Sequence, residues 1–175
     1  TTRTVAVAAM SAVALLAAGC GSGDDSGDTE TTAAKTGGEI TVRGCNPENP
    51  LVPSNTTETC GGNVIDAVFS KLVHYDAETA KPEMEVAESI ETTDNQNFTI
   101  KLKTGWKFHD GTDIKAKNFV DAWNYGAALD NAQLNSYFFE DIEGFSYDEN
   151  VPELSGLKVV DDTTFTVTLN KAASD

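Results

Sequence analysis

The chain has 175 residues, of which 28 are acidic and 12 basic, with a formal net charge of −16 and three cysteines. This acidity argues against nucleic acid or anionic lipid as a partner bound by charge, because like charges repel along the whole approach. We expect most of the acids to form a solvated surface rather than a specific acidic site.

The first segment, residues 1–19, carries one basic residue, Arg3, followed by small and apolar residues over 5–18. The run is too short and too rich in alanine for a membrane span, which needs about 20 strongly apolar residues, and it is typical of a secretory signal. It ends in LAAGC at Cys20, which resembles the bacterial lipobox, where the cysteine is lipidated. The motif predicts a lipoprotein signal peptide and a lipidated Cys20; a plain signal peptide with a spare cysteine is the alternative.

The next segment, residues 20–38, is rich in Gly, Ser, Thr and acids, with no apolar residue larger than alanine after the cysteine. Such a composition cannot bury enough surface to offset the entropy of ordering it, so we predict a disordered tether. A tether behind an acylated cysteine would hold a folded domain close to a membrane surface.

The two remaining cysteines, Cys45 and Cys60, enclose a stretch with three prolines. An exported protein meets oxidising conditions, and the count is even once Cys20 is lipidated, so a disulfide is expected. Closing a loop of about 15 residues stabilises by roughly 3 kcal/mol in the chain-entropy model. A metal site is the rival, but no second pair or histidine lies near enough in sequence to complete four ligands.

The elements on either side of this pair follow from local patterns. Residues 39–42 predict a short strand. A helix is predicted from Asn63, and proline should end regular structure at Lys81-Pro82. The apolar positions that predict one buried stripe on the helix are Val64, Ile65, Val68, Phe69, Leu72 and Val73.

The middle of the chain alternates apolar and polar residues over 98–103, which predicts a half-buried strand. We expect Thr104-Gly105 to turn the chain and Trp106 and Phe108 to lie on a returning strand. Asp110-Gly111 predicts a second turn, because glycine accepts positive φ and the aspartate oxygen can bond nearby N–H groups.

The last part of the sequence predicts an amphipathic helix and a strand pair. The helix is indicated by Phe119, Val120, Trp123 and Ala127 at helical spacing, and the strands over 157–160 and 165–169 flank a DDTT turn. The turn and the threonine-rich strand after it echo TTDNQNFTIKLK earlier in the chain, which we interpret as two hairpins rather than a repeat.

Catalytic signals are scarce. The two histidines, His74 and His109, are separated by predicted elements, and no nucleophile elbow, zinc-protease motif or P-loop occurs. His109 and Asp110 are consecutive residues of a tight turn, so their side chains need not face each other. We therefore predict no catalytic residues, no metal ligands and no cofactor, and hence no enzyme.

One long stretch, AESIETTDNQNFTIKLKTGWKFHDGTDIKAKNFVDAW, resembles the signature region of the family 5 extracellular solute-binding proteins, the oligopeptide- and dipeptide-binding class. In that family a strand ends in Leu-Lys or Leu-Arg, an aromatic-x-Phe-x-Asp-Gly segment follows, and a helix begins near an alanine. These features fall here on Leu102-Lys103, Trp106, Phe108, Asp110-Gly111 and Ala116. The similarity runs from about Gly38 to the end, and the lipobox with its tether is typical of the Gram-positive, actinobacteria-like form.

The resemblance implies a fold of the α/β class, mixed α+β. The chain would be the N-terminal part of a two-lobe periplasmic-binding-protein-like fold, with strands, hairpins and packed helices. It implies a partial solute-binding domain over 39–175, comprising the start of the first lobe (39–80), an inserted subdomain (81–154) and a return to the first lobe (155–175).

The implied function is that of a lipid-anchored substrate-binding component of an ABC importer on the extracellular face of the cell membrane. Its partners would be a peptide ligand, permease subunits with a cytoplasmic ATPase, and the membrane through the anchor. The loop after the first strand faces the cleft in the family, and the peptide backbone is held largely by β-augmentation. The resemblance places ligand contacts at Asn46, Pro47, Glu48, Asn49, Pro50 and Leu51.

Alternatives remain open at this stage. The 46–51 segment could be only a surface loop braced by a disulfide. The whole chain could also be a fragment of a secreted hydrolase, or an adhesion or signalling lipoprotein without transport.

Overall fold

The computed structural model describes residues 38, 39, 41 and 43–173. The predicted signal peptide, tether and lipidated Cys20 lie outside the described residues, apart from the last residue of the tether. The chain divides into two units, 1–41 and 42–175, and every helix and strand of the described part belongs to the second.

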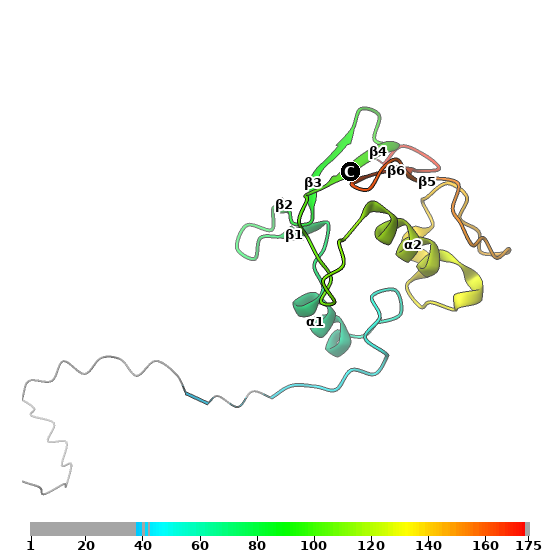
Figure 1. Cartoon of the computed structure of the whole chain (residues 1–175). Coiled ribbons are helices and arrows are strands. Elements are labelled where there is room, and N and C mark those ends of the chain that lie inside the picture. The colour runs from blue at the N-terminus through cyan, green and yellow to red at the C-terminus, as the bar shows by residue number, and fades with distance from the viewer. Residues whose placement is uncertain (1–37, 40, 42, 174–175) are drawn as a thin grey trace, which may run out of the picture. The chain divides into compact units, whose positions relative to one another are not determined.

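The second unit is built on a four-stranded antiparallel sheet of order β3-β4-β6-β5 (Figure 1). The strands are β3 (Ala87–Thr92), β4 (Asn97–Leu102), β5 (Leu157–Val159) and β6 (Thr164–Thr168). Two sequence-local hairpins, β3–β4 and β5–β6, are joined by the pairing of β4 with β6. The predicted strand over 98–103, the closing strand pair and the two-hairpin interpretation are confirmed.

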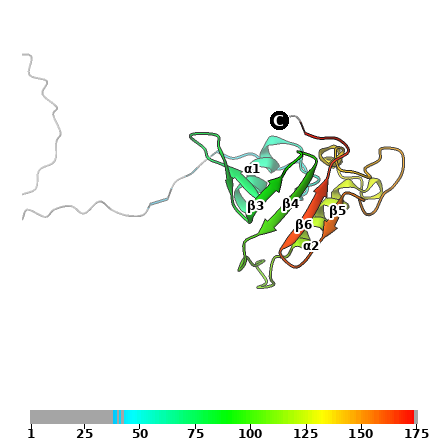
Figure 2. The same ribbon diagram turned by 90° about the horizontal axis from the view of Figure 1, so that it is seen from above.

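The sheet has one apolar face, as the alternation predicts. Ile100 and Phe165 lie opposite each other in the ladder and are both buried, whereas Lys101 on the other face is exposed. Helix α2 (Ala116–Ala127) packs across this apolar face (Figure 2). Its Phe119 ring stacks on Phe165 with centroids 5.9 Å apart, and its Trp123 ring meets the same phenylalanine edge-on at 5.7 Å.

Helix α2 is the predicted amphipathic helix, and its start is stabilised by Asn118. The side chain of Asn118 accepts a hydrogen bond from the Lys115 backbone N–H at 2.7 Å, and the Asn118 N–H donates to the Lys115 carbonyl at 2.9 Å. These bonds satisfy backbone groups that the first turn of a helix leaves unpaired.

Helix α1 (Thr59–Val68) begins and ends earlier than predicted. It starts at Thr59 because Glu58 accepts a hydrogen bond from the Gly61 N–H and acts as the N-cap. It ends before Leu72 and Val73 because Val73 pairs with Met84 in a small separate sheet.

That sheet is a hairpin of β1 (Val73–Tyr75) and β2 (Pro82–Met84). The expectation that Pro82 ends regular structure is wrong, since Pro82 is the first residue of β2. A proline is tolerated there because the first residue of an edge strand does not need to donate to the ladder.

Two further strand predictions fail. Glu39 and Thr41 have no regular structure, and their neighbours Ile40 and Val42 lie outside the described residues. The returning strand of Trp106 and Phe108 does not form, because β3 and β6 already occupy both edges of β4. The segment makes only an isolated bridge between Lys107 and Asp113.

The boundaries proposed at residues 80 and 155 stay a prediction. The main sheet takes strands from both sides of residue 155, and residues 42–175 form one compact unit.

Candidate functional site

The predicted ligand residues lie together on the stretch between Cys45 and α1, which we call the 46–58 loop. All six are on its surface; Asn49 is half-buried and the other five are exposed. The predicted disulfide is present, with the Cα atoms of Cys45 and Cys60 5.6 Å apart. It ties the start of the loop to the first turn of α1.

A carboxylate fastens the same loop from the helix side. Glu58 accepts hydrogen bonds from the Gly61 N–H at 2.7 Å and from the Glu48 N–H at 3.1 Å. Hydrogen bonding from backbone N–H groups, chiefly that of Gly61, holds the pKa of Glu58 below its usual value. A Cβ at Gly61 would lie 2.2 Å from the Glu58 Oε1 atom, so glycine leaves room for this cap.

The second half of the loop is closed by Thr56, the one buried polar residue in the described part of the chain. Its hydroxyl donates to the Pro50 carbonyl at 2.9 Å and lies 3.0 Å from the Val52 carbonyl. The backbone N–H groups of Asn55 and Thr56 also donate to Val52. The loop therefore presents Leu51 on a turn held by internal hydrogen bonds.

A cavity of about 710 Å³ adjoins the loop. It lies among α1, α2, the loop and the segment after α2, and its walls are mainly apolar. The large side chains lining it include Val52, Ile65, Phe69, Leu72, Phe108, Ile114, Phe119, Trp123, Phe138 and Phe139. Of the apolar stripe expected to be buried, Ile65 of α1 and the residues Phe69, Leu72 and Val73 after it line this wall, and Phe69 is 43% exposed. Nothing in the periodicity could distinguish a buried stripe from a cavity wall.

The His109-Asp110 pair sits in the predicted turn. One Asp110 oxygen accepts hydrogen bonds from the Thr112 N–H at 2.8 Å and from its hydroxyl at 2.7 Å, and Gly111 has φ of +88°. The bonds from Thr112, its hydroxyl first, lower the pKa of Asp110. The carboxylate thus stabilises the turn.

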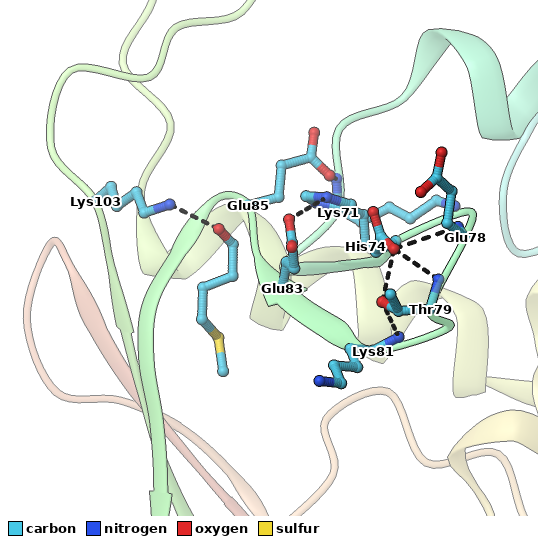
Figure 3. A network of polar contacts seen from close by, with 10 residues as sticks. Lys71, His74, Glu78, Thr79, Lys81, Glu83, Glu85 and Lys103 are labelled. Carbon is cyan, nitrogen blue, oxygen red and sulfur yellow. Dashed lines mark hydrogen bonds and ion pairs between the residues drawn. The ribbon is translucent and has the colours of Figure 1, made fainter.

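His74 belongs to a polar network on the β1–β2 hairpin (Figure 3). Its Nε2 atom lies 3.1 Å from the Glu83 carboxylate on the facing strand, and both side chains are substantially exposed. Asp76 closes the hairpin by accepting hydrogen bonds from the Thr79 N–H and hydroxyl. Within the described residues, no group of three or more His, Cys, Asp or Glu side chains is placed to hold a metal ion.

Two more bonds in Figure 3 hold this hairpin. The Lys71 N–H donates to Glu85 at 3.0 Å across the base of the hairpin, and the Lys103 ammonium, just after β4, donates to the Met84 carbonyl at 2.7 Å. The network therefore positions the hairpin against the end of β4.

The family model of the bacterial extracellular solute-binding proteins, family 5 Middle, matches residues 81–175. The match covers more than half of the chain, and the chain belongs to this family.

Named relatives agree with this membership. The oligopeptide-binding protein OppA of Bacillus subtilis is 27% identical over 124 residues, covering 69% of this chain and 23% of the relative. The periplasmic oligopeptide-binding protein OppA of Salmonella typhimurium is 26% identical over 176 residues, covering 95% of this chain and 30% of the relative. The chain thus spans less than a third of the length of these proteins.

A solved structure supports the fold. Listeria monocytogenes OppA bound to peptide superposes with a TM-score of 0.64 at 28% identity, over 69% of this chain and 25% of that one. The mixed helix-and-sheet architecture is therefore that of a periplasmic-binding-protein-like fragment. No helix in the part of the chain that the structure describes has the length and apolar character to cross a membrane.

The first prediction concerns the disulfide. Replacing both Cys45 and Cys60 by alanine should lower the free energy of unfolding by about 3 kcal/mol, because the bond closes a 15-residue separation in the unfolded chain. Thermal melts with and without reductant provide the measurement. Reductant should lower the melting temperature of the wild type but not of the double variant; equal melts in all four samples would contradict the bracing role.

The second prediction concerns pH. The pKa of Glu58 is lower in the folded than in the unfolded protein, so its stabilising effect is present above the unfolded value, near 4.3, and is lost as the pH falls through the folded pKa. Glu58→Gln should therefore destabilise at pH 7, and the difference from wild type should shrink at about pH 3.

The readout is the melting temperature at the two pH values. Glu153→Gln, which removes one exposed carboxylate elsewhere, is the control for net charge. A difference between Glu58→Gln and wild type that stays constant from neutral to acidic pH would exclude the capping role.

Proposed function

We propose that this chain is part of the extracellular substrate-binding component of an ABC importer. The complete protein captures oligopeptides or dipeptides and delivers them to membrane permease subunits, which are powered by a cytoplasmic ATPase. Family membership over residues 81–175 is the observation that carries this proposal. The names of the relatives, which are oligopeptide-binding proteins, support peptides as the ligand class.

In this proposal the 46–58 loop supplies part of the ligand contact, through Asn46, Pro47, Glu48, Asn49, Pro50 and Leu51. The loop suits that role because it is exposed yet held at both ends, by the disulfide and by Glu58. A pre-ordered loop loses less conformational entropy when a ligand binds. An extended peptide could then pair its backbone with that of the protein, while roomy surfaces accept its side chains.

The protein has a binding rather than a catalytic role in this proposal. The polar residues that a search for acid/base chemistry would select, Asp110 and His74, are engaged in a turn and a cross-strand pair. Binding without turnover is what an importer requires, since the captured peptide must be released intact to the permease.

Lipid anchoring at Cys20 is the second part of the proposal. The lipobox-like LAAGC and the polar segment after it support a mature N-terminus that is acylated and tethered to the extracellular face of a Gram-positive, actinobacteria-like cell membrane. No metal or cofactor enters the proposal.

The peptide-binding prediction is tested on the full-length protein. A random tri- to pentapeptide library should yield retained peptides by mass spectrometry, with dissociation constants on the order of micromolar or tighter by calorimetry. A retained peptide carrying a benzophenone should crosslink within the tryptic product 44–71, which contains the loop, and excess unlabelled peptide should suppress the crosslink.

The outcomes separate the alternatives. Retained peptides that crosslink only outside 44–71 would remove the loop from the site. Absence of any retained peptide would sink the peptide-binding function, and cleavage of the bound peptide would favour the hydrolase.

The anchoring prediction is tested in cells. Cys20→Ala should abolish incorporation of labelled palmitate and release the protein from the membrane fraction, because the acylated sulfur is lost. The Cys45→Ala/Cys60→Ala variant is the matched control and should stay labelled and membrane-bound. Unchanged labelling of Cys20→Ala would refute the anchor.

A further inference from the structure

We infer that Asn135 is a positioning residue for the proposed ligand loop: from the segment after α2 it holds the 46–58 loop in the shape that binds peptide. This inference rests on the proposed function. It assigns a role to a residue that lies far from the loop in sequence and that no local pattern selects.

Asn135 crosslinks two carbonyl groups of the loop. Its side-chain amide donates to the Pro53 carbonyl at 3.0 Å and to the Thr56 carbonyl at 2.8 Å, and its backbone N–H donates to the Ser54 carbonyl at 2.9 Å. One residue thus makes three hydrogen bonds to the four-residue stretch 53–56. Two of them use both protons of a single amide group, which only Asn and Gln side chains offer in this arrangement.

The neighbours of Asn135 extend the contact. The Ser54 hydroxyl donates to the Gln133 side-chain oxygen at 2.8 Å, and the Leu134 N–H donates to the Asn55 side-chain oxygen at 3.3 Å. Residues 133–135 therefore bind all four residues of the stretch 53–56. The partners are 79 residues or more apart in the sequence, so the contact depends on the tertiary fold.

Helix α2 brings the two segments together at Gly126. A Cβ placed there would lie 2.6 Å from the Phe139 ring and 3.2 Å from the Ser54 Cβ. Glycine is needed at this point because any side chain would push the loop and the segment after α2 away from the helix. The close approach keeps Ser54 of the loop and Phe139 of the segment after α2 against the same point of the helix.

The bonds made by Asn135 reach the proposed contact residues through Thr56. The Thr56 carbonyl is bound by Asn135, while its hydroxyl binds the Pro50 carbonyl. A shift of Thr56 would therefore move Pro50 and the adjacent Leu51. The disulfide and Glu58 hold the beginning and end of the loop, and Asn135 holds residues 53–56 in its second half.

The substitution that isolates this role is Asn135→Asp. Aspartate has nearly the same shape but no amide protons, so the carboxylate oxygen that replaces Nδ2 would face both the Pro53 and the Thr56 carbonyl oxygens. Asn131→Asp is the matched control: it adds the same charge in the same segment, but its side chain donates to the Tyr125 carbonyl and not to the loop.

The experiment uses the full-length protein and compares hydrogen exchange with peptide affinity. In Asn135→Asp, amides over 50–58 should exchange at least about tenfold faster in the absence of peptide, including those of Asn55 and Thr56 that donate to Val52. Affinity for a peptide selected from the tri- to pentapeptide library should fall by about tenfold or more. Exchange in β4 and β6 should stay at the wild-type level, and Asn131→Asp should match wild type in both measurements.

Each outcome is decisive. Wild-type exchange over 50–58 in Asn135→Asp, or affinity within about twofold of wild type, overturns the inference while leaving the proposed function intact. If hydrogen exchange in Asn135→Asp rises in β4 and β6 as much as it does over 50–58, the inference is also overturned. Asn135 would then stabilise the whole fold rather than the shape of the loop. If the wild-type protein itself retains no peptide, the proposed function fails and the inference falls with it.

Discussion

The pairing of β4 with β6 is the interaction on which the rest of the structure depends. It joins two local hairpins and sets Ile100 opposite Phe165, so that both side chains point to one face. A slip by one residue would turn this apolar face to solvent. Because Phe165 is fully buried under Phe119 and Trp123, the register also places α2, and α2 places the segment that holds the 46–58 loop.

The acidic composition has a structural use beyond solubility. Asp76, Asp94, Asp110 and Asp161 each accept hydrogen bonds from backbone N–H groups in a turn. These bonds and those from nearby side chains lower the pKa of all four carboxyl groups. The carboxylates therefore hold hairpins and turns in shape while the chain carries a large net negative charge. The proposed binding role gains ordered turns from these carboxylates.

The sequence predicted correctly those features that depend on the spacing of neighbouring apolar residues or on the pair of cysteines. Alternation over 98–103 predicted β4, helical spacing from Phe119 to Ala127 predicted α2, and the even count of cysteines besides Cys20 in an exported chain predicted the disulfide. The prediction misplaced both ends of α1 because the cap by Glu58 and the pairing of Val73 depend on partners outside the stripe. Trp106 was assigned to a strand because its spacing matched one, although no edge of β4 was free to pair with it.

The sequence by itself determined the family, the cysteine pair, the alternating strands and the Asp110-Gly111 turn, since each is carried by neighbouring residues. Only the tertiary structure decided the β4–β6 pairing, the cavity beside α1, and the contact of Asn135 with the loop. The physical reason is that a strand pattern states which face is apolar but not which edge will pair. Likewise, the sequence around Asn135, in an irregular segment, does not predict that it will bind carbonyl groups some 80 residues away. Those partners come within hydrogen-bonding distance only when the chain packs at Gly126.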